Sequence, residues 1–179
     1  NKETIIEFQI GYVPYNSDFY IELSKKYSEK EISDTGLFYK NEKYKKNINR
    51  FYSRIIFPIR NITGDVIAFG GRIIEDKKIA KYINSPETEF YKKGKHVFNL
   101  DKARSANNKP NEVVIVEGYM DVISIYSAGI KNVVSNSGIA LTESQINLIW
   151  KFFSNPIICL DGDVSCLLYT SPSPRDWLQ

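Results

Sequence analysis

The chain has 179 residues, with 24 Lys and Arg against 21 Asp and Glu, one His and two Cys. A hydrophobic content of 42% supplies enough apolar surface for a core, which excludes a disordered chain. The length predicts one domain or two small ones. No apolar run approaches the about 20 residues of a membrane helix, and the start lacks the apolar core of a signal peptide. We therefore predict a cytoplasmic protein with no membrane partner.

The formal net charge of +3 hides an uneven distribution of charged side chains. Residues 40–110 carry 17 basic and 7 acidic side chains, whereas residues 111–163 carry 2 basic and 6 acidic ones. This asymmetry suggests a surface that binds a polyanion, followed by a region that uses carboxylates. Cys159 and Cys166 form no CxxC pair and have no second His nearby, which argues against a zinc site within the chain.

The first half of the chain predicts short helices followed by strands. Apolar residues recur at helical spacing over residues 17–40 and continue to Phe38, which predicts two helices, the second capped by Ser28 with Glu31 at the capping-box position. Strands are predicted over residues 54–60 and 66–69, with a turn between them. We expect the pair of glycines at 70 and 71 to end the second strand and to let a ligand or another segment approach closely. Residues 77–110 are basic, aromatic and rich in turns.

After Pro110 the pattern becomes a regular alternation of strands and helices. The predicted elements are a strand over 113–116, a helix over 119–128 ended by Gly129, a strand over 132–135, a helix from Thr142 to about Phe153 with Gln145 at the capping-box position, and a strand over 156–160. Strand-helix-strand-helix-strand with short links predicts a parallel sheet whose three strands lie side by side.

Acidic residues follow two of these strands. Glu117 comes directly after the first strand, and Asp161 and Asp163 come after the third. The carboxyl ends of parallel strands meet at one edge, so these carboxylates should converge there, with Asp121 nearby on the first helical turn. Hard oxygen ligands suit Mg²⁺ or Mn²⁺. An Asp-Gly-Asp sequence can also be only a turn and a Glu only solvated, but their joint placement favours a metal site.

The segment Val116–Val122, which reads VEGYMDV, and the later Asp161-Gly162-Asp163 resemble the TOPRIM domain of bacterial DnaG-type primases. The likeness covers residues 8–163 in order. It continues upstream through Ile10–Pro14, Arg54–Ile59, Phe69–Arg72, Lys81–Thr88 and Lys93-Gly94. The fold that this resemblance implies is an α+β basic subdomain over residues 1–110, followed by an α/β TOPRIM domain over residues 111–163 that is cut short.

The resemblance implies an RNA polymerase that makes short primers from ribonucleoside triphosphates on single-stranded DNA during replication. It assigns catalysis and metal binding to Glu117, Asp161 and Asp163, and a secondary acidic role to Asp121. Nucleotide or phosphate contacts are implied for Arg72, Lys81, Tyr82, Asn84 and Lys93. Contacts with the template are expected from Arg50, Arg54, Arg60 and Lys95. Tyr52 stands where the family usually has a cation, which puts a contact at that position in doubt.

The resemblance also implies parts that the chain lacks. The family's zinc-binding module would precede Asn1, and the domain that binds the replicative helicase would follow the core. Residues 164–179 contain two prolines and cannot continue the helix that the family has there, so we expect a foreign, disordered tail. Without the remaining sheet and acids, the chain as it stands is expected to fold marginally and to catalyse little. The protein is expected to be a monomer.

Two other interpretations stay open at the level of the sequence. One is another TOPRIM enzyme, such as a phage primase-helicase, a topoisomerase or a nuclease; the upstream Phe-Gly-Gly-Arg and Lys-Tyr-Ile-Asn-Ser segments favour a primase. The other is a non-catalytic module that binds single-stranded DNA and keeps the carboxylates only as a turn. Dependence on a divalent metal separates the enzymes from the binding module.

Overall fold

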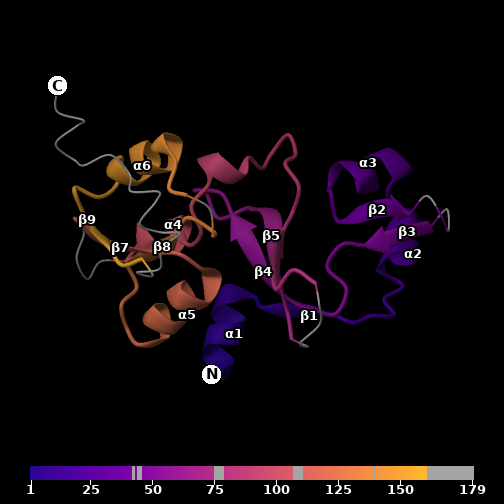
Figure 1. Ribbon diagram of the computed structural model, residues 1–179, viewed down its shortest axis with the longest axis horizontal. Coiled ribbons are helices and arrows are strands. Elements are labelled where there is room, and N and C mark those ends of the chain that lie inside the picture. The colour runs from indigo at the N-terminus through magenta and orange to yellow at the C-terminus, as the bar shows by residue number, and fades with distance from the viewer. Residues whose placement is uncertain (42, 44–45, 75–78, 107–110, 139, 161–179) are drawn as a thin grey trace. The chain divides into compact units, whose positions relative to one another are not determined.

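The computed structural model describes residues 1–160, apart from residues 42, 44–45, 75–78, 107–110 and 139 (Figure 1). The chain separates into two compact units. Unit 1 comprises residues 1–60 and 65–92, and unit 2 comprises residues 61–64 and the described residues from 93 onward. The division after Lys92 comes earlier than the predicted boundary at residue 110. Each unit is described below by itself.

The main sheet of unit 1 is antiparallel, with the strand order β1-β4-β5-β6. Its strands are β1 (Gly11–Val13), β4 (Arg54–Arg60), β5 (Val66–Ile73) and β6 (Tyr82–Asn84). The two strands expected from alternating apolar residues both form, and they pair with each other over most of their length. β1 and β6 add a short strand at either edge.

The two glycines of β5 do not end the strand, which corrects that expectation. β5 continues to Ile73 because Gly70 and Gly71 pair with β4 on one side and with β6 on the other. The close approach is present: a Cβ at Gly71 would lie 2.7 Å from Cδ1 of Phe51. The missing side chain thus makes room for the buried Phe51 ring.

The other elements that the described residues of unit 1 form are three helices and a hairpin. They are α1 (Lys2–Phe8), α2 (Phe19–Ser24), α3 (Glu29–Asp34), β2 (Phe38–Asn41) and β3 (Lys46–Asn49). The capping box of α3 is confirmed, because the Glu31 carboxylate accepts the Ser28 amide at 2.8 Å and Ser28 Oγ accepts the Glu31 amide. The hydrogen bonds that the Ser28 amide and the Ser28 hydroxyl donate to the Glu31 carboxylate lower the pKa of Glu31. Phe38 was expected in the helix, but the chain turns at Gly36, whose φ is 66°, and Phe38 begins β2.

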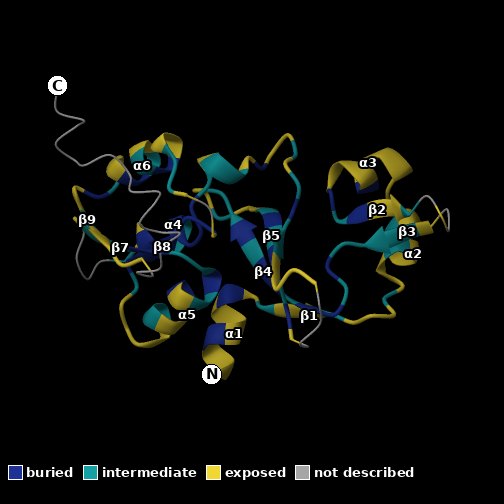
Figure 2. Cartoon of the chain, viewed as in Figure 1, coloured by how far each residue is buried: buried dark blue, intermediate teal, exposed yellow. Residues whose placement is uncertain are grey.

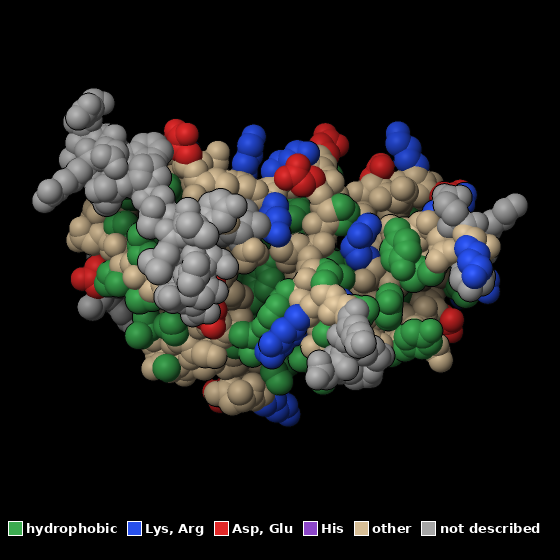
Figure 3. Space-filling view, in the orientation of Figure 1, with side chains coloured by type: hydrophobic (Ala, Val, Ile, Leu, Met, Phe, Trp, Pro, Cys, Tyr) green, Lys and Arg blue, Asp and Glu red, His purple; other side chains and the backbone are tan. Residues whose placement is uncertain are grey.

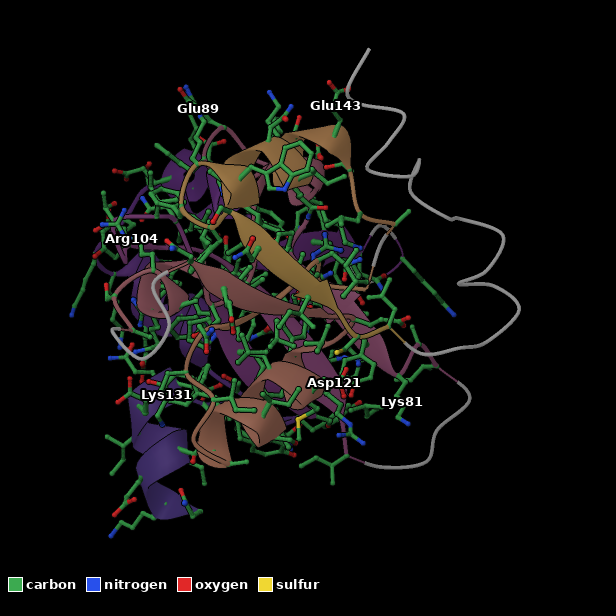
Figure 4. All side chains as sticks on the ribbon, turned by 90° about the vertical axis from the view of Figure 1, so that its left-hand side faces the viewer. Lys81, Glu89, Arg104, Asp121, Lys131 and Glu143 are labelled. Carbon is green, nitrogen blue, oxygen red and sulfur yellow. The ribbon has the colours of Figure 1, made fainter. Side chains whose placement is uncertain are left out.

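Unit 2 is built on a parallel sheet, as predicted, with the strand order β8-β7-β9. Its elements are the 3₁₀-helix η1 (Lys93–Lys95), α4 (Leu100–Ala103), β7 (Glu112–Val116), α5 (Tyr119–Ser127), β8 (Val133–Ser135), α6 (Glu143–Trp150) and β9 (Asn155–Ile158). Helices α5 and α6 lie on opposite faces of the sheet (Figures 1 and 4). These helices leave β7 and β8 largely buried. β9, at one end of the strand order, is mostly exposed (Figure 2).

The core of unit 2 explains why the division between the units falls at residue 92. Val97, Leu100 and Ala103 pack with Val113 and other apolar residues of the sheet and of α6. The segment from 93 to 103 is basic like the chain before it, but its apolar side chains belong to the parallel sheet. Among the described residues, no helix is long and apolar enough to cross a membrane.

The helix ends of unit 2 follow the local signals in the sequence. Thr142 caps α6, and Thr142 Oγ1 accepts the Gln145 amide at 3.2 Å. α6 ends at Trp150, earlier than predicted, although Phe153 still lies in the core. α5 ends at Ser127, and Gly129 follows with a φ of 104°, the left-handed conformation that favours glycine at a helix end.

Candidate nucleic-acid interface and carboxylate edge

Glu117 lies at the carboxyl end of β7, at an edge that we call the carboxylate edge: Glu117, Asp121 and the loop of residues 136–138. The Glu117 carbonyl accepts a hydrogen bond from Ser135 Oγ at 2.6 Å and another from the Gly138 amide at 2.9 Å. These two bonds tie the loop after β8 to the end of β7. The backbone that carries the Glu117 carboxylate is therefore held from the neighbouring strand.

β9 brings the third strand to the same edge. The Cys159 amide donates to the Ile115 carbonyl at 2.8 Å, so the parallel pairing of β9 with β7 extends to this residue. The described chain ends at Leu160, beside the strand that carries Glu117. The predicted catalytic acids Asp161 and Asp163 lie outside the described residues, and so does the tail of residues 164–179.

Asp121 stands in the first turn of α5, the end of that helix nearest to the carboxyl ends of the strands (Figure 4). Its Oδ2 atom accepts a hydrogen bond from the Gly118 amide at 3.0 Å. The secondary acid thus caps the helix that follows Glu117 and fixes the turn between them. Within the described part of the chain, no group of three or more metal-ligating side chains occurs. The carboxylate oxygens of Glu117 and Asp121 are of the kind that a hard cation prefers.

In unit 1, two of the predicted nucleotide-binding residues lie together on the sheet. Arg72 of β5 pairs with Tyr82 of β6, and the Arg72 guanidinium carbon lies 5.5 Å from the centre of the Tyr82 ring. Lys81 precedes Tyr82 and is exposed, and Asn84 is half-buried where it pairs with Gly70. Cationic and hydrophobic side chains lie side by side over the surface of this unit (Figure 3).

Arg54 is placed differently from the other cations. Its side chain is only 5% exposed. One guanidinium nitrogen donates to the Ala80 carbonyl at 2.8 Å and the other donates to the Lys81 carbonyl at 3.1 Å. Burial lowers the pKa of this guanidinium. Arg54 therefore holds the backbone that leads into β6, although the sequence suggested a contact with the template.

The remaining predicted contacts are spread over both units. In unit 1, Arg50 Nε donates to the Gly36 carbonyl at 3.0 Å and the Arg60 guanidinium donates to Gln9 Oε1. In unit 2, Lys95 is exposed in η1, and the backbone carbonyl of Lys93 accepts from Gln145. The structure thus brings Arg72 and Tyr82 into contact, whereas Arg50, Arg54 and Arg60 are also engaged within their own unit.

Two features of these surfaces were missed from the sequence. Ser135 supports the end of β7, and a serine at the end of a short strand carries no distinguishing signal. Tyr12 lies in β1 and is 53% exposed. It stands within the Ile10–Pro14 segment that resembles the primases, but nothing in its local sequence indicates which face of a sheet it occupies.

Two family models match this order of an antiparallel basic unit followed by a parallel α/β unit. The DNA primase catalytic core, N-terminal domain, matches residues 1–104, and the Toprim domain matches residues 111–165. The chain therefore belongs to the family of DNA primase catalytic cores.

Individual relatives support this membership. The chain is 42% identical to a DNA primase of Halalkalibacterium halodurans over 166 residues and 40% identical to one of Deinococcus radiodurans over 160 residues. These matches cover 92% and 88% of this chain but 28% of each relative, so the chain spans little more than a quarter of their length.

Solved structures of primase cores have the same fold. The E. coli primase catalytic core matches with a TM-score of 0.85 and 34% identity, over 94% of this chain and 54% of that one. A DnaG primase catalytic domain bound to single-stranded DNA matches with a TM-score of 0.84 and 34% identity, over 94% of this chain and 53% of that one.

Proposed function

We propose that the protein that contains this chain is a DNA primase, which synthesises short RNA primers on a single-stranded DNA template. The observation that carries this proposal is the family membership of both units in their observed order. The relatives named DNA primase, and the related catalytic domain bound to single-stranded DNA, support the same activity. Another TOPRIM enzyme is not favoured, because the match to the primase N-terminal domain extends over residues 1–104.

Within this proposal, the carboxylate edge holds Mg²⁺ or Mn²⁺ through Glu117, with Asp161 and Asp163 as the further ligands. A divalent cation bound there would activate the attacking 3′-hydroxyl and would neutralise charge on the leaving pyrophosphate. Other residues of the chain hold the backbone around Glu117 in place. Ser135 and the Gly138 amide hold the end of β7, and Asp121 fixes the turn into α5.

The cations and aromatics of the basic region bind the substrates. Ribonucleoside triphosphates would be held by Arg72, Lys81, Tyr82, Asn84 and Lys93, and the template strand by cations that include Arg50, Arg60 and Lys95. Binding through phosphates predicts an affinity that falls steeply with salt. The same proposal includes a contact between the whole protein and the replicative helicase. It also places the protein in the cytoplasm at the replication fork, as a monomer.

The test compares the two ends of strand β7 in the full-length primase. Glu117 follows the carboxyl end, and Glu112 begins the amino end. Glu117→Gln should reduce the incorporation of labelled ribonucleotides on a single-stranded template by about 100-fold or more, the scale at which a preorganised electrostatic partner acts. Glu112→Gln should leave incorporation nearly unchanged. Full incorporation in the Glu117→Gln protein would contradict the proposed site.

A further inference from the structure

Four residues stand in line across one face of the main sheet in unit 1. Tyr12 of β1 is paired with Ile55 of β4, Ile55 with Arg72 of β5, and Arg72 with Tyr82 of β6. Directly opposed residues of antiparallel strands point to the same face of the sheet. These four residues therefore form one continuous row, which we call the aromatic row.

The aromatic row is open at both of its ends. Tyr12 is 53% exposed and Tyr82 is 41% exposed, while Ile55 and Arg72 between them are half-buried. Further along β4, on the same face as Ile55, Phe57 and Ile59 are each only 1% exposed. The row is thus the accessible part of a face that is otherwise covered, and large aromatic side chains occupy its two exposed positions.

The spacing and chemistry of the row suit unpaired bases. Neighbouring strands lie about 4.8 Å apart, so three steps place the two tyrosines about 14 Å from each other. Aromatic side chains on a four-stranded sheet can stack two or three bases of a single strand over such a distance. Arg72 already lies over the Tyr82 ring and supplies a cation for a phosphate or a base between the tyrosines. The positive charge of residues 40–110 attracts the strand.

We propose that Tyr12 stacks against an unpaired base of single-stranded nucleic acid that lies along the aromatic row, while Arg72 and Tyr82 at the other end hold the ribonucleoside triphosphate. The proposal rests on the proposed function, because it requires that this chain bind a single strand. It adds a residue of β1 to the nucleic-acid surface and a means of holding the strand by its bases as well as by its phosphates.

The experiment separates bases from phosphates. Fluorescence anisotropy would measure the affinity of the 179-residue chain for a labelled thymidine strand of about 12 nucleotides, within the usual site size of one small domain. A strand of equal length without bases carries the same phosphates. The wild-type chain should prefer the thymidine strand. Tyr12→Ala should lower this preference about 5-fold or more, the scale of losing one stacked base, without changing the affinity for the abasic strand.

Two further variants control for folding and for general surface effects. Tyr12→Phe keeps the ring and should keep the preference for bases. Tyr27 is 52% exposed in the same unit but lies outside the row, so Tyr27→Ala should behave as the wild type. An unchanged preference in the Tyr12→Ala chain, or an equal loss in Tyr27→Ala, would overturn the assignment of Tyr12.

The wild-type chain itself distinguishes this proposal from the one on which it rests. Equal affinity for the thymidine and abasic strands would overturn the aromatic row while leaving single-strand binding through phosphates in place. A wild-type chain that binds neither strand would contradict binding by this chain altogether, and the aromatic row with it.

Discussion

The two units use their sheets in opposite ways. The parallel sheet of unit 2 has a helix on each face, and its strands β7 and β8 are mostly buried, so the ends of these two strands are where a ligand can approach them. The antiparallel sheet of unit 1 leaves part of one face open, and residues such as Tyr12 and Tyr82 remain accessible there. Carboxylates therefore stand at an edge in unit 2, whereas cations and aromatics stand on a face in unit 1.

Both units combine an apolar core with buried polar groups. The core cluster of unit 2 is aliphatic and aromatic. Unit 1 buries polar groups as well, among them Arg54 and the nearly inaccessible Tyr91. Burial, with a smaller contribution from the Glu87 charge, raises the pKa of the Tyr91 hydroxyl to about 12. Buried polar groups hold segments that lie far apart in the sequence in unit 2 too, where the Gln145 side chain donates to the His96 carbonyl and the Asn99 side chain donates to the Val133 carbonyl.

The largest expected effect is on the apolar core of unit 2. Ile149 of α6 is 1% exposed, so Ile149→Ala should lower the free energy of unfolding by about 2–5 kcal/mol. Ile158 of β9 is 52% exposed, and Ile158→Ala should change that free energy by about 0.5 kcal/mol or less. Urea unfolding of both variants measures the difference. Similar losses would mean that α6 does not cover the sheet as described.

A smaller effect is expected from the buried cation of unit 1. Arg54→Met removes two hydrogen bonds to backbone carbonyls and should cost about 1–3 kcal/mol. Amide hydrogen exchange at Ile73, which donates to the Lys81 carbonyl, should become faster because Arg54 no longer holds the same carbonyl. Arg72→Met on the opposite face serves as the control and should leave that exchange rate unchanged. Unaltered exchange in the Arg54→Met chain would refute the holding role.

The smallest effects concern the two capping boxes, one in each unit. Ser28→Ala and Thr142→Ala should each lower the free energy of unfolding by about 1 kcal/mol. The loss should be greater for Thr142, because its hydroxyl also donates to the Gly94 carbonyl and joins α6 to η1. Thermal unfolding of the two variants tests this order. A greater loss for Ser28, whose box is exposed, would reverse the comparison.

The sequence predicted the parallel unit closely because its signals are local. Thr142 with Gln145 marks the start of α6, Gly129 marks the end of α5, and each strand is a short apolar run. The antiparallel unit was predicted less completely. Phe38 was assigned to a helix, and the hairpin that it begins was not expected, because its apolar spacing continues that of α3 until Gly36 turns the chain.

The functional residues also differ in whether local sequence predicts their place. Glu117 was predicted as a site residue because it follows an apolar strand in a recognisable motif, and the structure places it directly after β7. The role of Arg54 could not be predicted, because its partners Ala80 and Lys81 lie 26 and 27 residues away. In sequence, Arg54 and Arg72 look alike, but they stand on opposite faces of the sheet.

By itself, the sequence determined the order of a basic and an acidic region, the alternation of strands and helices after Pro110, and the position of Glu117 at a strand end. Only the tertiary structure decided which cations reach solvent and which aromatics form a row. The physical reason is that side chains alternate between the two faces of a strand, so strand pairing and register settle which residues meet on a face. Tyr12 and Tyr82 are 70 residues apart in the chain, and three strand pairings place them in one line.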